Sequence, residues 1–250
     1  GTIFFMEIVL IGIICFCGAF VQALLGFGYA VFVTPLVAII LGPKIAIAFS
    51  IVTSTFASYL LFFQRGAYHE LRNVSVLAFT AVIGTPIGIY FLLYLNEDLI
   101  RFLISVAIFI SAFVSLRKKN NEQHDESVFF KTIVGLLSGI MRGTVSMGGP
   151  PVVIYQNWIG GTPDIIRNRM YAFFVWISPV GIILLLPSGL INIDLVKLLP
   201  FSILSIFSGI FVGAKYRVRI STSIFHFLSM SLLFFISVIG IINSILIWVN

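Results

Sequence analysis

One basic residue of this sequence lies where an ion could be bound. Arg142 stands in residues 139–151, which read Gly-Ile-Met-Arg-Gly-Thr-Val-Ser-Met-Gly-Gly-Pro-Pro between two apolar segments. The glycines permit tight, exposed backbone, and the proline pair suits the first turn of a following helix, where an N–H would be unpaired. Such a helix start directs a positive dipole end and its free N–H groups toward Arg142. The stretch therefore predicts an anion site formed by Arg142, Gly143, Ser146, Gly148 and Gly149.

A looser counterpart of this break lies about 120 residues earlier, where residues 18–28 read Gly-Ala-Phe-Val-Gln-Ala-Leu-Leu-Gly-Phe-Gly. Its candidate substrate contacts are Gln22, Gly26 and Gly28, and we expect Gln156, beyond the second break, to shape the same site. The alternative for the first break is a plain glycine kink between packed helices. The alternative for Arg142 is an arginine that snorkels from a helix end to the membrane interface.

Patterns for catalysis or metal binding do not occur in the sequence. The three histidines lie in or near loops, and no hydrolase, metalloprotease or phosphate-loop motif is present. Only Glu7 among the acidic residues is embedded in an apolar segment, so a pair of catalytic carboxylates is not expected. Cys15 and Cys17 would point to different faces of one helix, which suits neither a disulfide nor a metal. We expect no enzyme activity, catalytic residue, metal or cofactor.

Composition places these breaks inside a membrane protein. The 250 residues are 60% hydrophobic and 10% charged, with a mean hydropathy of +1.14, which leaves too little polar surface for a water-soluble globule. The apolar runs lack the period-2 alternation of a lipid-facing barrel strand, so the spans should be helices. The net charge of +6 comes from residues in short loops, which indicates membrane topology and no nucleic-acid partner. The predicted fold class is an all-α polytopic protein of the lipid bilayer.

The apolar segments fall into two similar halves. A span needs about 20 apolar residues, and by this measure the full spans are residues 4–25, 45–63, 74–95, 99–116, 171–186, 193–213 and 223–249. Shorter pieces flank the breaks at residues 29–41, 129–141 and 152–159. We assign residues 1–116 to a first membrane repeat, 117–128 to a cytoplasmic linker and 129–250 to a second membrane repeat.

Glycine and proline positions support a duplication. Each half has five apolar segments, an odd number of passages whether its first two cross fully or form a re-entrant hairpin, so the second copy should be inverted. The prediction is two inverted repeats, each a broken or re-entrant helical hairpin followed by three transmembrane helices. The matching positions are Gly18 and Gly28 with Gly139 and Gly149, Pro43 with Pro163, Gly66 with Gly189, and Gly84-x-x-x-Gly88 with Gly209-x-x-x-Gly213.

The basic residues predict an orientation. If the spans alternate, one side has only Lys44, Arg101 and Lys197, and Arg142 belongs to neither side. By the positive-inside rule the richer side is the cytoplasm, so we expect a multi-pass protein of the bacterial inner membrane with both termini outside. The residues on the richer side are Arg65, Arg72, Arg117, Lys118, Lys119, Lys131, Arg167, Arg169, Lys215, Arg217 and Arg219.

Three further features have two interpretations each. The G-x-x-x-G faces suit close helix packing within the chain, with a homodimer interface as the alternative. The hydroxyl run Ser50, Thr53, Ser54 and Thr55 is more typical of bonds to its own backbone than of substrate contact. Arg167 and Arg169 are most simply topology determinants, and the alternative is a basic mouth that attracts anions.

With its breaks and duplication, the chain resembles the sulfite exporter TauE/SafE family, also called the toluene sulfonate uptake permease family. The resemblance rests on Gly-Ala-Phe-Val-Gln-Ala-Leu-Leu-Gly-Phe-Gly-Tyr-Ala at residues 18–30, on the stretch 139–151, and on the repeated plan. It implies transport of a sulfur-containing or organic anion, such as sulfite, sulfoacetate or a related sulfonate. We therefore expect a secondary transporter with its site at the two breaks near mid-membrane, and an anion channel lined by the same breaks is the alternative.

Overall fold

The computed structural model describes residues 2–116, 127–216 and 238, and in these residues every regular element is helical. The α-helices are α1 (Thr2–Leu25), α2 (Tyr29–Leu41), α3 (Pro43–Arg65), α4 (Ser75–Tyr94), α5 (Glu97–Leu116), α6 (Val128–Val145), α7 (Gly149–Ile159), α8 (Pro163–Leu185) and α9 (Ile193–Tyr216). Short 3-10 helices η1 (Ala67–Glu70) and η2 (Leu186–Ser188) follow α3 and α8. Six helices of this part, α1, α3, α4, α6, α8 with η2, and α9, are long and apolar enough to cross a membrane. The predicted all-α, multi-pass class is confirmed.

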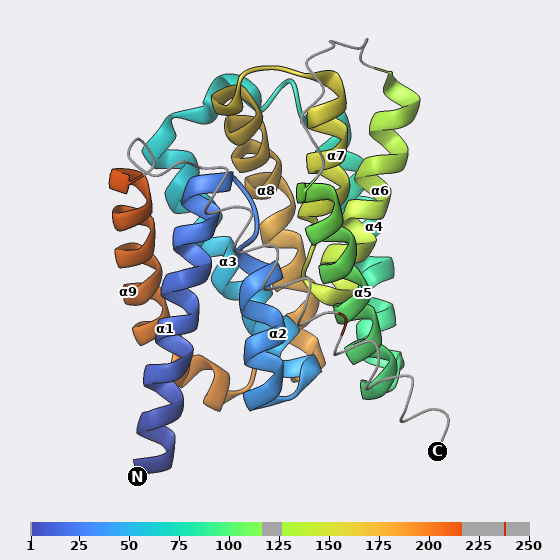
Figure 1. The fold of residues 1–250 in the computed structure, drawn as a ribbon. Helices are drawn as coiled ribbons and strands as arrows, with labels where there is room; N and C mark the ends of the chain where they lie inside the picture. Colours follow the sequence, from blue (N-terminus) through green and yellow to red (C-terminus); the bar gives the residue numbers. More distant parts are fainter. Residues whose placement is uncertain (1, 117–126, 217–237, 239–250) are drawn as a thin grey trace.

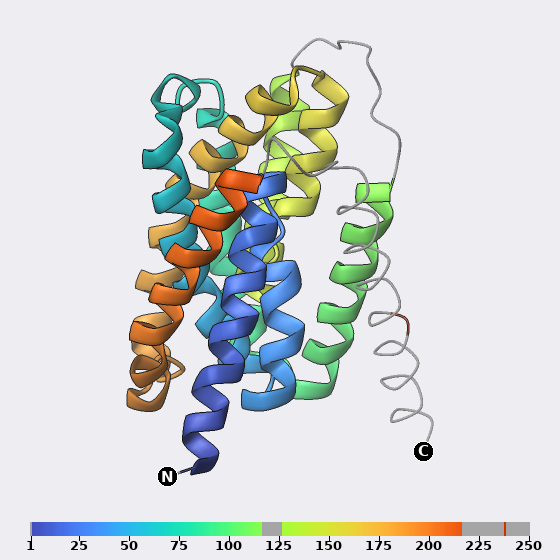
Figure 2. The same ribbon diagram turned by 60° about the vertical axis from the view of Figure 1, so that its left-hand side comes forward.

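Two hairpins enter the bundle from opposite ends. Helix α1 rises and α2 returns toward the end at which α1 began, as Figure 1 and Figure 2 both show. Helix α6 descends from the other end and α7 returns to it (Figure 1). With 13 residues in α2 and 11 in α7, both returning arms are shorter than the length needed to cross a bilayer. Each hairpin thus starts and finishes at one end of the bundle.

Helices from the two halves of the chain pack against one another. Helices α3 and α8 are in contact, α1 lies against α9, and α4 lies against α6. Glycines make the last two contacts close, since a Cβ at Gly88 would stand 2.2 Å from the carbonyl oxygen of Ile140, and one at Gly209 2.4 Å from that of Phe16. The predicted packing of the G-x-x-x-G faces within the chain is confirmed, and these faces are covered there.

Two helix boundaries differ from the predicted segments in ways that affect the site. Helix α8 begins at Pro163 and not at residue 171, because Thr162 caps it by accepting a hydrogen bond from the Ile165 N–H at 3.4 Å. The polar first turns of α8 had concealed this start. Helix α6 continues to Val145, four residues beyond the predicted end, so Arg142 lies in its last turn and not in the break. Apart from residue 238, the segment 223–249 lies outside the described residues, as does most of the predicted linker 117–128.

Basic residues gather at one end of the bundle. The end of α3, the starts of α6 and α8 and the end of α9 lie at the upper end in Figure 1, and the starts of α3, α5 and α9 lie at the lower end. The upper end accordingly has Arg65, Arg72, Lys131, Arg167, Arg169 and Lys215, and the lower end has Lys44, Arg101 and Lys197. We call the upper end the basic end. Arg117, Lys118, Lys119, Arg217 and Arg219 lie outside the described residues.

Candidate functional site

The turn of each hairpin depends on left-handed backbone. Between α1 and α2, Gly28 has φ 105°, a conformation that glycine adopts without a steric cost. Between α6 and α7, Ser146 has φ 64°, and it is the only non-glycine residue with positive φ in the described part of the chain. This conformation costs a non-glycine residue about 1 kcal/mol or more. A residue held in this way is a candidate for a function that a glycine would not serve.

The two turns meet. The hydroxyls of Ser146 and of Thr34, on α2, are hydrogen-bonded at 2.6 Å. A Cβ at Gly149, the first residue of α7, would lie 3.4 Å from the ring of Phe27 in the first break. Ser138 of α6 also donates a hydrogen bond to the carbonyl oxygen of Gly148, which holds the second turn against its own helix. Breaks that are far apart in the sequence therefore form one place in the fold.

A small cavity lies between these breaks. Its volume is about 20 Å³, measured as the space open to the centre of a water molecule. That is room for roughly one or two waters. The lining is mixed, with hydroxyl, amide and guanidinium groups beside aromatic and aliphatic ones. Residues from α1, α2, α3, α6, α7 and α8 contribute: Gln22, Gly28, Tyr29, Ala30, Val31, Ser54, Ser58, Arg142, Ser146, Met147, Gly148, Gly149 and Phe174.

Arg142 is the charged residue of this cavity, and it is 1% exposed. Its Nη2 donates to the Oγ of Ser178 at 3.0 Å, and its guanidinium carbon lies 5.9 Å from the centre of the Phe174 ring. Its Nε has no hydrogen-bond partner, and no carboxylate of the described residues pairs with it. An isolated arginine inside a membrane costs about 3 kcal/mol or more. The surroundings keep the cation buried without a counter-ion, which is the condition under which an anion would be bound.

Two helix starts point their positive ends at the same space. The N-cap of α7 is Gly148 and that of α2 is Gly28, neither makes a side-chain cap bond, and both line the cavity. The first N–H groups of a helix have no acceptor within it. In α7, Pro150 and Pro151 lack this group, so the N–H donors expected there are reduced. In α2, residues Tyr29, Ala30 and Val31 line the cavity and retain their N–H groups, so the first break supplies the donors that the sequence had assigned to the second.

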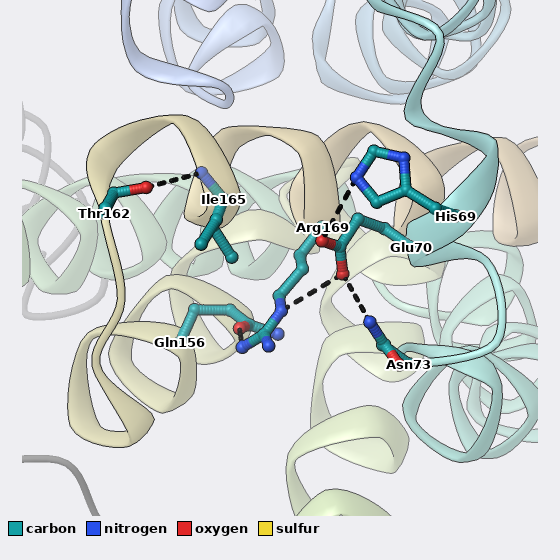
Figure 3. A network of polar contacts seen from close by, with 7 residues as sticks. All are labelled: His69, Glu70, Asn73, Gln156, Thr162, Ile165 and Arg169. Atoms are coloured by element: carbon teal, nitrogen blue, oxygen red, sulfur yellow. Dashed lines mark hydrogen bonds and ion pairs between the residues drawn. The ribbon is translucent and has the colours of Figure 1, made fainter.

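The structure brings six of the nine candidate residues together. Gln22, Gly28, Arg142, Ser146, Gly148 and Gly149 line the cavity. The other three lie outside it. Gly26 packs on Arg167, because a Cβ added at Gly26 would be 2.8 Å from the Cγ of that residue. Gly143 packs on α4, because a Cβ added at Gly143 would be 2.5 Å from the carbonyl oxygen of Thr85. The side chain of Gln156 accepts a hydrogen bond from the Nη1 of Arg169 at 3.3 Å (Figure 3).

Four residues around Arg142 had not been identified as contacts. Ser54 and Ser58 of α3 line the cavity, and Ser58 accepts a hydrogen bond from the Nε2 of Gln22 at 3.2 Å. Phe174 and Ser178 of α8 hold the guanidinium. Both pairs are spaced i, i+4 and so share a helix face, which is the signal that sequence reasoning could have used. The backbone bonding expected for the hydroxyl run is confirmed for Thr53, Ser54 and Thr55, which donate to carbonyl oxygens of their own helix. It is not found for Ser50, whose buried Oγ has no hydrogen-bond partner among the described residues.

A family model described as sulfite exporter TauE/SafE matches residues 10–239. A search of curated protein sequences and a search of solved structures gave no match.

Proposed function

Because the chain belongs to the sulfite exporter TauE/SafE family, we propose that it is a secondary transporter of a small sulfur oxyanion or organosulfonate, which binds in the cavity beside Arg142. Members of this family are membrane transporters and not enzymes. The observation that carries the proposal is a buried guanidinium that has no carboxylate partner among the described residues, at a cavity that two helix starts also face. A cation and helix N-termini both favour an anion.

Each wall of the cavity has a different part in binding. Arg142 provides the charge, and its Nε is a donor without a partner. The first turn of α2 provides N–H groups, as helix starts do in other anion sites. Gln22 and the hydroxyls of Ser54 and Ser58 can contact the remaining oxygens. Phe174 excludes water from one side of the guanidinium, which strengthens each charge-assisted bond.

The packing of the two halves supports an inverted repeat. The first helix of each half lies against the fourth helical segment of the other, α1 on α9 and α6 on α4. Pro43 and Pro163 begin α3 and α8, and Gly66 and Gly189, with φ of 61° and 73°, follow the ends of α3 and η2. We infer that the two hairpins rock against the α3 and α8 pair and open the cavity to one side at a time.

The size of the cavity favours a transporter over a channel and a small anion over a large one. A space of about 20 Å³ is narrow and has to widen even for sulfite. A channel needs a continuous opening, whereas an alternating carrier passes through closed states. We therefore expect sulfite and other small oxyanions to compete for the site more strongly than an aromatic sulfonate.

Counterflow tests this proposal. In proteoliposomes, internal unlabelled sulfite should accelerate uptake of labelled sulfite several-fold, and uptake should saturate, because a carrier returns faster when loaded. Empty liposomes and liposomes preloaded with chloride are the controls. Flux that does not saturate and gains nothing from internal sulfite would favour the channel. Absence of any sulfite flux or binding by the folded protein would reject the substrate class.

Cysteine labelling tests the proposed orientation, in which the basic end is cytoplasmic and both termini are outside. In a background with Cys15→Ala and Cys17→Ala, Tyr68→Cys would place a thiol in η1 at the basic end and Ile193→Cys would place one at the opposite end. Both positions are exposed. An impermeant maleimide should label the Ile193→Cys variant in intact cells and the Tyr68→Cys variant only after permeabilisation. The reverse pattern would invert the topology.

A further inference from the structure

We propose that a crevice between α4, α5 and α6 binds one acyl chain of a bilayer lipid, from the leaflet at the end opposite the basic end. The volume of the crevice is about 410 Å³, on the same measure as that of the Arg142 cavity. This lies within the range of roughly 300–1,000 Å³ found for small-molecule pockets. The crevice shares no lining residue with the Arg142 cavity, and the inference does not depend on the proposed function.

The packing of α5 explains why the crevice exists. Helix α5 contacts α2 and α3, and its residues Ile100, Ile104 and Ile108 are buried. The neighbouring face of α5, from Leu103 to Ile110, stands opposite the end of α4 and the end of α6 across the crevice. Figure 2 shows α5, in green, at the edge of the bundle. The crevice is thus a gap between one outer helix and the closely packed pair of α4 and α6.

The depth of the crevice matches one leaflet of the bilayer. The first turn of α5 contains Glu97 and Asp98, and charged side chains of this kind stay at the membrane surface. At 1.5 Å per residue, the lining residues Leu103 and Ile110 lie about 9 Å and 20 Å along the helix from Glu97. One leaflet with its polar interface is about 20 Å thick. The crevice therefore runs from the headgroup boundary to the midplane, as an acyl chain does.

The lining of the crevice has the chemistry of hydrocarbon. None of the described residues that line it is charged. Its one polar side chain is Thr144, whose hydroxyl lies 2.9 Å from the carbonyl oxygen of Ile140 and 3.2 Å from that of Gly88. An oxyanion would find no free donor there, and water stays out of apolar cavities. Phe91 and Ile110 line the crevice and are each 40% exposed, so the crevice continues into the apolar surface that faces lipid.

Packing is what an acyl chain gains in this crevice. The lipid that the chain leaves is as apolar as the crevice, so no hydrophobic free energy is gained. The walls of a void lack partner atoms and lose dispersion contacts, which a bound chain restores along three helices. The chain would also pack on Met141 and Val145, the sequence neighbours of Arg142 and Ser146. It would thus brace the end of α6 that forms the Arg142 cavity.

Fluorescence quenching by brominated lipid tests the site. The background is Trp158→Phe, Trp176→Phe and Trp248→Phe, which removes the native tryptophans. Ile110→Trp places a reporter in the crevice, and Phe207→Trp places one on the exposed face of α9. Both positions lie about 20 Å from the first residue of their helices, so the reporters are matched in depth. Both should be quenched in bilayers of phosphatidylcholine with bromine at mid-chain. After dilution into unbrominated lipid, quenching of Ile110→Trp should decay about tenfold more slowly, because a bound chain has a longer residence time.

Filling the crevice should remove this slow decay. Ala107→Phe changes a lining residue that is 3% exposed and places a ring where the chain would lie. Val106→Phe is the milder variant, because Val106 also lines the crevice but is only partly buried. In either variant that folds, quenching of Ile110→Trp should decay as fast as that of Phe207→Trp. The matched control Leu204→Phe adds a ring on the exposed face of α9 and should leave the slow decay unchanged.

Three results would overturn the acyl-chain site. Equal decay for the two reporters would mean that no chain is held in the crevice. Slow decay that persists in folded Ala107→Phe and Val106→Phe variants would place the chain elsewhere. If brominated lipid quenched Phe207→Trp but never Ile110→Trp, protein would cover the crevice, either a second copy or a part of this chain outside the described residues. None of these measurements involves sulfite, so their outcome leaves the proposed function untouched.

Discussion

Replacement of Arg142 by methionine is expected to abolish anion transport and to raise the stability of the folded protein. Methionine fills much of the same volume but has no charge and no donor. Loss of two charge-assisted hydrogen bonds, at about 1.5–3 kcal/mol each, would weaken sulfite binding roughly 100-fold or more. Stability should rise by about 1–3 kcal/mol, because a buried cation without a counter-ion is replaced by an apolar side chain. The lost bond to Ser178 offsets part of this gain.

Two measurements separate these effects. Equilibrium binding of labelled sulfite in detergent reports the loss of the site, and thermal unfolding of the same sample reports the gain in stability. Arg142→Lys should give an intermediate result, because it retains the charge without the planar set of donors. Arg101→Gln is the control, since it removes an exposed cation at the opposite end and should change neither quantity by much. If the Arg142→Met variant were less stable and still bound sulfite, Arg142 would have a structural role and no role in binding.

The second large effect is expected at the contact between α4 and α6. A Cβ at Gly88 would stand 2.2 Å from the Ile140 carbonyl oxygen, 2.8 Å from the Gly143 Cα and 2.9 Å from the Thr144 nitrogen. All three are backbone atoms, so the helices would have to separate. Gly88→Ala should therefore destabilise the protein by about 3 kcal/mol or more, at the upper end of overpacking costs, and little folded protein should reach the membrane.

A glycine that faces one side chain is the matched control for this variant. A Cβ at Gly181, inside α8, would meet the Cγ2 of Ile51 at 2.9 Å, so one buried side chain, and not two helix backbones, would have to shift. Gly181→Ala should therefore destabilise the protein by only about 1–2 kcal/mol, because the helix preference of alanine offsets part of the overpacking. Membrane yield and the midpoint of thermal unfolding are the readouts. Equal behaviour of the two variants would mean that α4 and α6 are further apart than described.

Local features of the sequence were sufficient for most helix positions and for the burial of Arg142. Apolar runs and Gly or Pro breaks identified the segments, and the lack of a loop for Arg142 indicated that it lies inside the bundle. Contacts between distant segments could not be read in this way. Gln156 appeared suitable for the site, but it accepts a bond from Arg169 at the basic end, and Ser58 reaches the cavity because α3 packs beside α1 and α2.

The backbone N–H donors of the proposed site are a second feature that could not be predicted from local sequence. Prolines at the start of α7 were correctly placed in its first turn, but the same residues remove N–H groups from the proposed anion site. The first turn of α2, preceded by Gly28, lines the cavity and had appeared to be the weaker half. Which helix start faces the cavity depends on how the two hairpins meet, and that is a tertiary property.

The packing of helices from one half of the chain against helices of the other half also sets an order of assembly during synthesis. About 170 residues separate the end of α1 from the start of α9, and at 5–20 residues per second the ribosome needs roughly 10–30 s to make them. During that interval α1 is in the bilayer without α9. The part of the α1 backbone that Gly209 and Gly213 later cover therefore still faces lipid. A chain truncated before α9 would therefore remain a substrate for membrane proteases, even though most of its helices had already been inserted.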